Sequence, residues 1–335
     1  MEFTTGGRLE VRITAADLGR RVSVRSLTGT GETTPRFTDT VGVLTSWTGG
    51  VLRITRRDGQ VVALRESAVV AAKVVPAAPA RRRGGPAAGA RELQRVAARG
   101  WPPLETERLG EWTLRASRGF TSRANSVLVL GGPGIPAGAA LERVTAWYAA
   151  RDLPAVFQVS TGYAGDDAEL VAELDRRGWT AGKHTVFCTG ALAPLADRAP
   201  DERVRLNREP GDAWLRAYGR AAGAHDETAS RVLGGGPSVW FATVPGAAGG
   251  PPAAIGRCVV DGRWAGFAAV EVPPAQRRRG LATAVLAELA RQALAEGASA
   301  AYLQVETGNT EARALYAGLG FADHHTYHYR TAPQR

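Results

Sequence analysis

The clearest pattern of hydrophobic positions lies in the last quarter of the chain. Apolar residues recur at helical spacing from Ala282 to Ala293, which predicts an amphipathic helix with one stripe on a core. A β-prone run at 263–272 precedes this helix, and an apolar run at 300–306 follows it. The second run is typical of a buried strand in a parallel pair. A shorter helical stripe at 309–319 extends the order to strand, turn, helix, strand, helix and a last strand.

Further elements are predicted upstream of this unit. Asp261 and Gly262 form a two-residue turn of the kind that joins antiparallel strands. Asp212 is a suitable cap for the first of two short helices. In chain order we predict a strand at 203–208, a helix from Asp212 and a second helix at 228–233. Two more strands are predicted at 239–244 and 253–260. Residues 203–332 are therefore predicted to form an α/β (α+β) domain with a mixed sheet flanked by helices.

The middle of the chain repeats part of this order. Residues 141–179 give a helix, a strand, an acidic loop, a short helix and a glycine-aromatic pair. Phe157-Gln158-Val159 corresponds in position to Leu303-Gln304-Val305, and Gly178-Trp179 corresponds to Gly320-Phe321. These matches suggest an internal duplication. The first copy has glycines but no basic residue before its helix, and no tyrosine in its short helix. We expect residues 91–195 to form a degenerate, structural lobe, with a phosphate-binding role for the glycines as the alternative.

The first 75 residues show a third pattern. Five short β-prone runs lie between residues 8 and 66, and Gly49-Gly50 and Asp58-Gly59 mark hairpin turns between the later ones. They predict a small SH3-like β-barrel over residues 1–75. Residues 76–90, rich in proline, glycine, alanine and arginine, predict a flexible linker. The barrel is either a packing or dimerisation module or a module that recognises protein or nucleic acid.

The turn before the helix at 282 has the composition of an anion site. Three consecutive arginines, Arg277 to Arg279, precede Gly280, and the first amides of a helix lack intrahelical acceptors. These amides and the helix dipole favour an anion such as a pyrophosphate. Gly280 lets the backbone approach a ligand and tolerates dihedral angles that other residues avoid.

Composition changes this picture only slightly. A chain of 335 residues suggests two or three domains, and the net charge of +10 comes almost wholly from arginine, since Lys73 and Lys183 are the only lysines. Such arginine usage fits a GC-rich coding bias, although a basic surface also attracts nucleic acid or acidic substrates. The chain has no long apolar run and no leader pattern, so a soluble cytoplasmic protein is expected. Cys188 and Cys258 predict neither a disulfide framework nor a zinc site, and no metal is expected.

Two motifs in the correct order resemble the GNAT superfamily of acetyl-CoA-dependent N-acetyltransferases. The hallmark Q/R-x-x-G-x-G/A is present as Arg277, Arg278, Arg279, Gly280, Leu281 and Ala282. A second pattern, N-x-x-A-x-x-L-Y-x-x-x-G-F, is present at Asn309, Ala312, Leu315, Tyr316, Gly320 and Phe321. The resemblance covers residues 203–332 and implies a GNAT fold. Together with the first copy it implies tandem lobes, one active and one silent.

The resemblance also implies a role for individual residues. Acetyl-CoA would pair with backbone groups of Val270 and Val272, and its pyrophosphate would accept from amides of residues 278–282 and from the Thr283 hydroxyl. Asn309 would bind the pantetheine arm, and Tyr316 is the general-acid position. The cofactor-binding set is thus Val270, Val272, Arg277, Arg278, Arg279, Gly280, Leu281, Ala282, Thr283, Asn309, Ala312 and Tyr316. Tyr316 also lies on an apolar stripe, so a purely packed aromatic residue is the alternative.

The general base is open between two carboxylates. Glu271 alternates away from Val270 and Val272 on its strand, and Glu306 ends the neighbouring strand; either could deprotonate an amine through water. A surface or ion-paired role is the alternative for both. His225, Asp226 and Glu227 are candidates for recognition of the amine, or else a polar turn between helices.

These inferences predict an N-acetyltransferase. It would transfer an acetyl group from acetyl-CoA to a primary amine of a small molecule, or to a lysine or N-terminus of a protein. One alternative is a regulatory protein that binds acyl-CoA without turnover. Another is a nucleic-acid-associated protein that uses the basic N-terminal module.

Overall fold

The computed structural model describes residues 11–27, 37–56, 59–75, 87–163, 165–219, 226–248 and 250–333. The chain divides into two compact units, Met1–Arg83 and Gly84–Arg335. None of the helices in the described segments combines the length and hydrophobicity needed to cross a lipid bilayer.

The smaller unit is a single six-stranded sheet with the order β1-β6-β2-β3-β4-β5. Alternation along β2 puts Val22 and Val24 in its core, where they meet Leu44 and Ile54. Its edge strands, β1 and β5, are not paired with each other in the described residues, so closure into the predicted barrel is not seen there. The strands are β1 (Val11–Arg12), β2 (Arg21–Leu27), β3 (Phe37–Thr48), β4 (Val51–Thr55), β5 (Val61–Arg65) and β6 (Val69–Val74), with short 3-10 turns η1 (Ala15–Asp17) and η2 (Glu66–Ala68).

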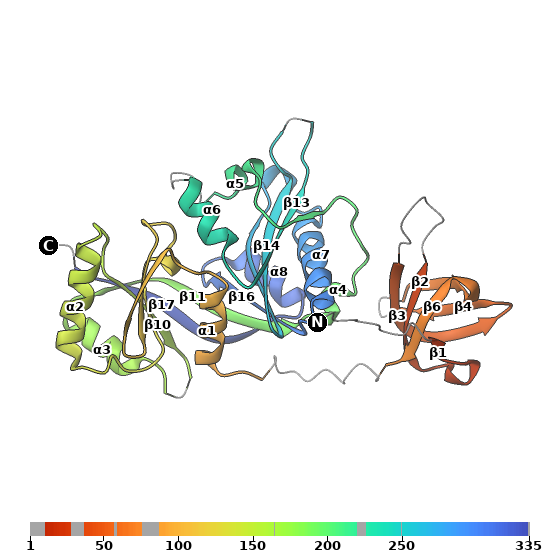
Figure 1. The fold of residues 1–335 in the computed structure, drawn as a ribbon, viewed down its shortest axis with the longest axis horizontal. Helices are drawn as coiled ribbons and strands as arrows, with labels where there is room; N and C mark the ends of the chain where they lie inside the picture. Colours follow the sequence, from red (N-terminus) through yellow and green to blue (C-terminus); the bar gives the residue numbers. More distant parts are fainter. Residues whose placement is uncertain are drawn as a thin grey trace, which may run out of the picture. The chain divides into compact units, whose positions relative to one another are not determined.

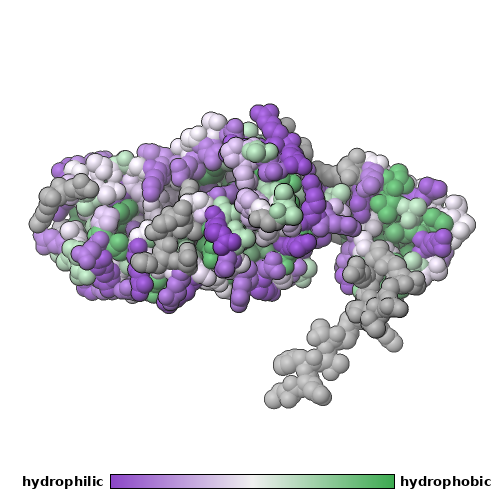
Figure 2. Space-filling model, turned by 90° about the horizontal axis from the view of Figure 1, so that it is seen from above, coloured by the Kyte–Doolittle hydropathy of each residue, from purple (hydrophilic) through white to green (hydrophobic). Residues whose placement is uncertain are grey.

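The sixth strand is a correction: the predicted barrel extended to residue 75, but its five β-prone runs ended at residue 66. Residues 69–74 read VVAAKV and lack the alternation that marks a half-buried strand, yet β6 lies between β1 and β2 in the sheet. Six of the seven large hydrophobic residues that are exposed among the described ones lie in this unit. Figure 2 shows hydrophobic residues gathered on the face of the smaller unit that it presents.

The larger unit is built on one 11-stranded sheet with the order β12-β13-β14-β15-β16-β11-β17-β10-β9-β8-β7. Strands of the first half are β7 (Glu105–Leu109), β8 (Trp112–Ala116), β9 (Val127–Val129), β10 (Val156–Thr161) and β11 (Thr180–Ala191). Strands of the second half are β12 (Arg205–Asn207), β13 (Ser238–Val244), β14 (Ala254–Asp261), β15 (Trp264–Glu271), β16 (Ala300–Glu306) and β17 (Ala322–Thr331).

Helices cover both halves of this sheet. The first half carries α1 (Ala90–Arg99), η3 (Ser122–Ala124), α2 (Ala137–Ala149), α3 (Ala168–Arg176) and α4 (Ala193–Ala196). The second half carries α5 (Asp212–Ala217), α6 (Asp226–Gly234), η4 (Pro274–Gln276), α7 (Leu281–Ala295) and α8 (Thr310–Gly318). The predicted stripe of α7 is buried, and it packs on β13, β14 and β15. In Figure 1, β11, β16 and β17 run between the helices of the two halves.

The two halves exchange their last strands. β11, from the first half, pairs antiparallel with β16 of the second half, from Thr185↔Glu306 to Ala191↔Ala300. β17, from the second half, pairs antiparallel with β10 of the first half, and β11 and β17 pair with each other. The sheet therefore runs without interruption across the predicted lobes 91–195 and 203–332, and the two lobes share one compact unit.

Three local predictions need correction or a limit. The linker 76–90 lies mostly outside the described residues, but its end is ordered: Ala87 O accepts from Arg263 at 2.6 Å, and Ala90 is the buried first residue of α1. Asp212 is not a cap, because Gly211 occupies the N-cap position of α5. Cys188 and Cys258 are both buried free thiols.

Candidate active site

Two parallel strands of the second lobe separate partway along their length. β15 and β16 pair from Trp264↔Ala300 to Phe267↔Leu303, and no pairing continues beyond that point. The cause is a bulge on β15, where the register with β14 shifts and Ala269 adopts a φ of +52°. Beyond Phe267 and Leu303 the facing edges of β15 and β16 are not paired with each other, and we call this stretch the opening.

The opening leads to the basic turn predicted from the sequence. After β15, η4 and the arginines bring the chain to Gly280, whose φ of +74° is in the left-handed region that glycine adopts readily. A Cβ built at Gly280 would have no heavy atom within 4 Å, so the backbone faces open space. α7 then begins at Leu281 with no side-chain cap, which leaves the first amides available to an anion.

Close packing holds this turn in position. A Cβ at Gly256 of β14 would lie only 2.4 Å from a methyl group of Val285, so α7 contacts the sheet at a point where glycine is required. Arg277 donates through Nε to Val272 O at 3.3 Å and pairs with Glu311 of α8 at 3.2 Å. Arg277 therefore links the end of β15 to α8, while Arg279 binds Gln276. The Arg278 side chain forms no hydrogen bond or ion pair with the residues that the structure describes.

Asn309 and Tyr316 lie at the two ends of α8. Asn309 Oδ1 accepts from the Ala312 amide at 3.1 Å, as predicted for a cap, so this oxygen already has a partner. The Tyr316 ring packs against Phe321 with 6.1 Å between ring centroids. Burial raises the pKa of Tyr316 to about 12. Its hydroxyl has no hydrogen bond to any described residue.

The two candidate bases differ in their surroundings. Glu271 Oε2 accepts from the Gly219 amide at 3.1 Å and so holds the segment that follows α5. Glu306 is exposed at the end of β16, opposite Thr185 of the exchanged strand β11. Of the proposed amine-recognition group, His225 lies outside the described residues, and Glu227 is exposed on α6.

A small cavity at the inner end of the opening contains residues that the sequence reading missed. Its volume is about 10 Å³, and β15 and β16 contribute Gly266 to Ala268, Tyr302 and Gln304. Two arginines complete it, each 5.0 Å from the Trp101 ring. Arg257 donates to the carbonyls of Leu233, Gly100 and Gly235 at 2.5 to 2.9 Å.

Arg123 reaches this cavity from η3 of the first lobe, and its buried Nε has no hydrogen-bond partner. The first lobe therefore contributes a cation at the inner end of the opening. Arg257 could have been recognised from the sequence, because it is a single arginine in the apolar run of β14. Arg123 lies in a segment with no periodic pattern and gave no such signal.

Comparison with known proteins identifies the family. A family described as "Probable histone acetyltransferase Rv0428c C-terminal" matches residues 87–330. The chain belongs to this family. It is a GNAT-type N-acetyltransferase with tandem lobes, and hence an acyltransferase. A second family, described as "Rv0428c N-terminal Sm-like domain", matches residues 16–73, so the N-terminal β unit is matched as Sm-like where we had predicted an SH3-like barrel.

Individual relatives agree with this assignment. The chain is 31% identical over 322 residues to "Probable histone acetyltransferase Rv0428c" of Mycobacterium tuberculosis, covering 94% of this chain and 95% of that protein. It is 26% identical over 254 residues to "Uncharacterized N-acetyltransferase YobR" of Bacillus subtilis, covering 72% and 97%.

Solved structures share the fold. A GCN5-related N-acetyltransferase from Kribbella flavida has a TM-score of 0.52 at 18% identity, over 73% of this chain and 96% of its own. A tandem GNAT protein from the clavulanic acid biosynthesis pathway has a TM-score of 0.51 at 18% identity, over 75% and 91%.

Proposed function

We propose that this GNAT-type enzyme transfers an acetyl group from acetyl-CoA to a primary amine, in the second lobe. The observation that carries the proposal is the combination, within one strand-turn-helix unit, of the bulge at Ala269 and the glycine turn at Gly280. The bulge separates β15 from β16, and the turn presents free amides at the outer end of the same strand. Acetyl-CoA supplies the activated thioester.

The residues at the turn suit the pyrophosphate. Gly280 presents its backbone to open space, and the amides at the start of α7 are uncapped donors. Arg278 and Arg279 are exposed and add positive charge, while Arg277 maintains the link to α8. In this proposal Leu281, Ala282 and Thr283 supply donors, and Val270 and Val272 present backbone groups along the opening. Asn309 would offer its amide NH₂ to the pantetheine arm, with Ala312 beside it.

Tyr316 is the proposed proton donor to the departing thiolate. Its hydroxyl is protonated at neutral pH, since burial raises its pKa from an ordinary value that is already well above 7, and a general acid must carry a proton. The Val270 amide is the proposed donor to the carbonyl oxygen of the acyl group.

The base is proposed to be Glu271 or Glu306, acting through water. Glu271 accepts a hydrogen bond from the Gly219 amide near the end of β15, and Glu306 is exposed at the end of β16.

The acceptor is proposed to be a primary amine on a small molecule or on a protein lysine or N-terminus. The name of the mycobacterial relative refers to histones, which supports testing lysine peptides first. Release of free thiol from acetyl-CoA, measured with lysine peptides and with small amines, would identify the acceptor class.

A matched pair of variants tests the cofactor site. Gly280 and Gly297 lie at opposite ends of α7 and both have left-handed φ values, +74° and +96°. Gly280→Asp should remove the thermal stabilisation by CoA, because the carboxylate would repel the pyrophosphate, while Gly297→Asp should keep it. An equal CoA-dependent shift in both variants would contradict the proposed site.

A further inference from the structure

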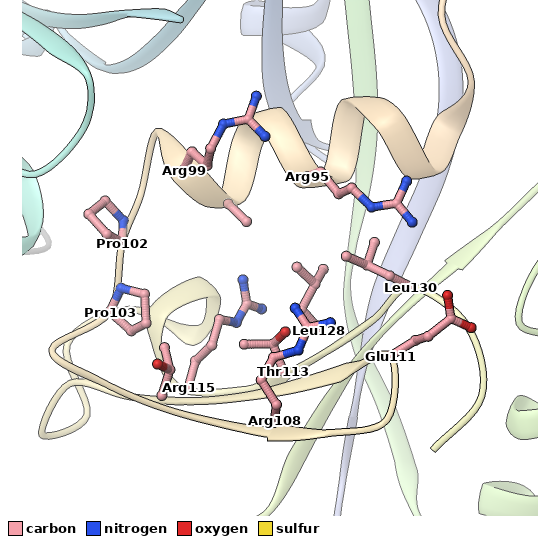
Figure 3. A pocket seen from close by; sticks show the side chains of 12 residues that line it. Arg95, Arg99, Pro102, Pro103, Arg108, Glu111, Thr113, Arg115, Leu128 and Leu130 are labelled. Carbon is pink, nitrogen blue, oxygen red and sulfur yellow. The ribbon is translucent and has the colours of Figure 1, made fainter. Parts of the chain in front are cut away.

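The first lobe contains a cavity that the proposed acetyl transfer does not use. Its volume is about 430 Å³, within the range of small-molecule sites. Residues of α1 line one side, and residues of β7, β8 and β9 line the other. Figure 3 shows Arg95 and Arg99 on the α1 side and Arg108, Thr113 and Leu128 on the strand side of the same space.

The internal duplication explains why this space exists. In the second lobe, one face of β13 and β14 is covered by α5 and α6, whose Trp214 and Leu233 pack on Phe241 and Val259. In the first lobe, Leu114 and Val127 point toward α2 and α3, so the alternate side chains of β8 and β9 point to the opposite face. Among the described elements α1 lies over that face, and its Val96 and Ala97 pack in a cluster with residues of β11, β15 and β16. The cavity therefore occupies the place that α5 and α6 fill in the other lobe.

The lining combines an apolar floor with excess positive charge. Leu128 and Leu130 are buried, and four arginines face a single glutamate, Glu111. Two of the arginines are already satisfied. Arg99 pairs with Asp261 at 2.7 Å, and Arg115 donates to Ser126 and to Gln158 at 2.8 Å.

The other two arginines have no partner among the residues that the structure describes. The side chains of Arg95 and Arg108 form no hydrogen bond or ion pair with residues in the described segments, and both are exposed at the cavity. Glu111, whose carboxylate accepts from the Gly132 amide at 3.2 Å, carries one negative charge and so cannot balance both guanidinium groups. Two unpaired guanidinium groups above a leucine floor are complementary to a carboxylate or similar anion that carries a hydrophobic body.

We propose that this cavity is a binding site for a small organic anion with an apolar body, separate from the acyl-CoA site of the second lobe. Arg95 and Arg108 bind the anionic group from opposite sides, and the apolar body lies on Leu128 and Leu130. Thr113 lies on the strand side of the same cavity and adds a hydroxyl.

The test uses the full chain, with CoA at saturation so that the acyl site is occupied. Phenylacetate is the probe, and phenylacetamide is its uncharged control. Binding of each compound is measured by isothermal titration calorimetry and by saturation-transfer NMR. Arg95→Glu and Arg108→Glu remove the proposed contacts. Arg65→Glu, on an exposed arginine of the smaller unit, is the matched charge control. Thr113→Trp fills the cavity without changing its charge.

We expect phenylacetate to bind at least about tenfold more tightly than phenylacetamide, the scale of one charge-assisted hydrogen bond. Each of the two charge reversals should weaken phenylacetate by a similar factor, Thr113→Trp should abolish binding, and Arg65→Glu should leave it unchanged. Equal weakening by Arg65→Glu, or equal affinity for the amide, would overturn the proposal, as would the absence of binding at millimolar probe. Gly280→Asp separates the two sites, because it should remove CoA binding and leave phenylacetate binding intact.

Discussion

Tyr316 combines a packed ring with an unpartnered hydroxyl, and the two properties can be separated experimentally. If the hydroxyl protonates the thiolate, Tyr316→Phe should lower the single-turnover rate by roughly 10²-fold while CoA affinity stays unchanged. The free energy of unfolding should barely change, because the substitution retains the apolar volume that packs on Phe321. Equal rates in the two proteins would assign Tyr316 to packing alone.

Two histidines of β17 make a different prediction, about acid stability. Burial lowers the pKa of both His325 and His328 to about 4, from an ordinary value of 6.5. The unfolded chain therefore binds more protons between those values, so stability is present above pH 6.5 and is lost as the pH falls toward 4. After allowance for solvent screening, each histidine should account for on the order of 1 kcal/mol of the folding stability that is lost between pH 7 and pH 5.

His328→Gln tests this directly. Glutamine keeps an acceptor for Arg330, which donates to His328 Nε2 at 3.0 Å, but it cannot titrate. The decrease in Tm between pH 7 and pH 5 should be smaller in the variant than in the parent protein. An identical decrease would show that His328 does not contribute to the acid sensitivity.

Residues whose position depends on local sequence were predictable. Gly280 and Asn309 occupy the turn and the cap that their neighbours predict, because both features depend on a few adjacent dihedral angles. Arg123 was not predictable, since its place beside β15 depends on contact between segments more than a hundred residues apart. Likewise Asp212 was misassigned as a cap by one position, which is the usual uncertainty at a helix end.

At the scale of elements, the bulge in β15 is the feature that opens the sheet. Ala269 has a φ of +52°, a conformation that is costly for a β-branched residue and permitted for glycine. Ala269→Val should lower stability by about 1–2 kcal/mol and reduce CoA affinity, because relief of the strain would straighten the strand. Ala269→Gly should retain CoA binding. Titration of CoA against both variants checks this, and unchanged affinity in the valine variant would separate the bulge from cofactor binding.

At the scale of the whole molecule, the smaller unit should be dispensable for cofactor binding. Every proposed catalytic group lies in the larger unit, which begins at Gly84. Because the carbonyls of Ala87 and Ala88 accept hydrogen bonds within this unit, a truncated chain should begin near residue 84. A truncated chain of residues 84–335 should show the same thermal shift with CoA as the full chain. Loss of that shift in a folded truncated chain would place part of the site in residues 1–83.

The larger unit should not tolerate a similar cut between its lobes. Residues 203–335 alone would expose the edge of β16 that β11 covers through seven paired residues. We expect this half to be insoluble or unfolded when expressed alone, and co-expression with residues 84–202 to restore it. Circular dichroism and size-exclusion chromatography would measure both, and a stable, monomeric isolated half would contradict the prediction.

Hydrophobic periodicity predicted the order of elements in the second lobe and in residues 141–179 of the first, but not α1, β7, β8 and β9, and not the exchange of β11 and β17. Each of these strands could complete its own lobe or the other one with the same alternation of side chains. The choice depends on long-range pairing, such as Val186↔Val305, that no local pattern encodes.

The exchange has a consequence for how this protein can change over generations. The first lobe has lost the basic turn and the tyrosine of its twin, yet it cannot be discarded, because its last strand completes the sheet on which its twin depends. Selection on acetyl transfer therefore extends to β11, which lies in the lobe that lacks the basic turn. Substitutions that disrupt β11 should therefore lower the acetyltransferase activity proposed for the second lobe. The two halves of the gene should accordingly be retained or lost together.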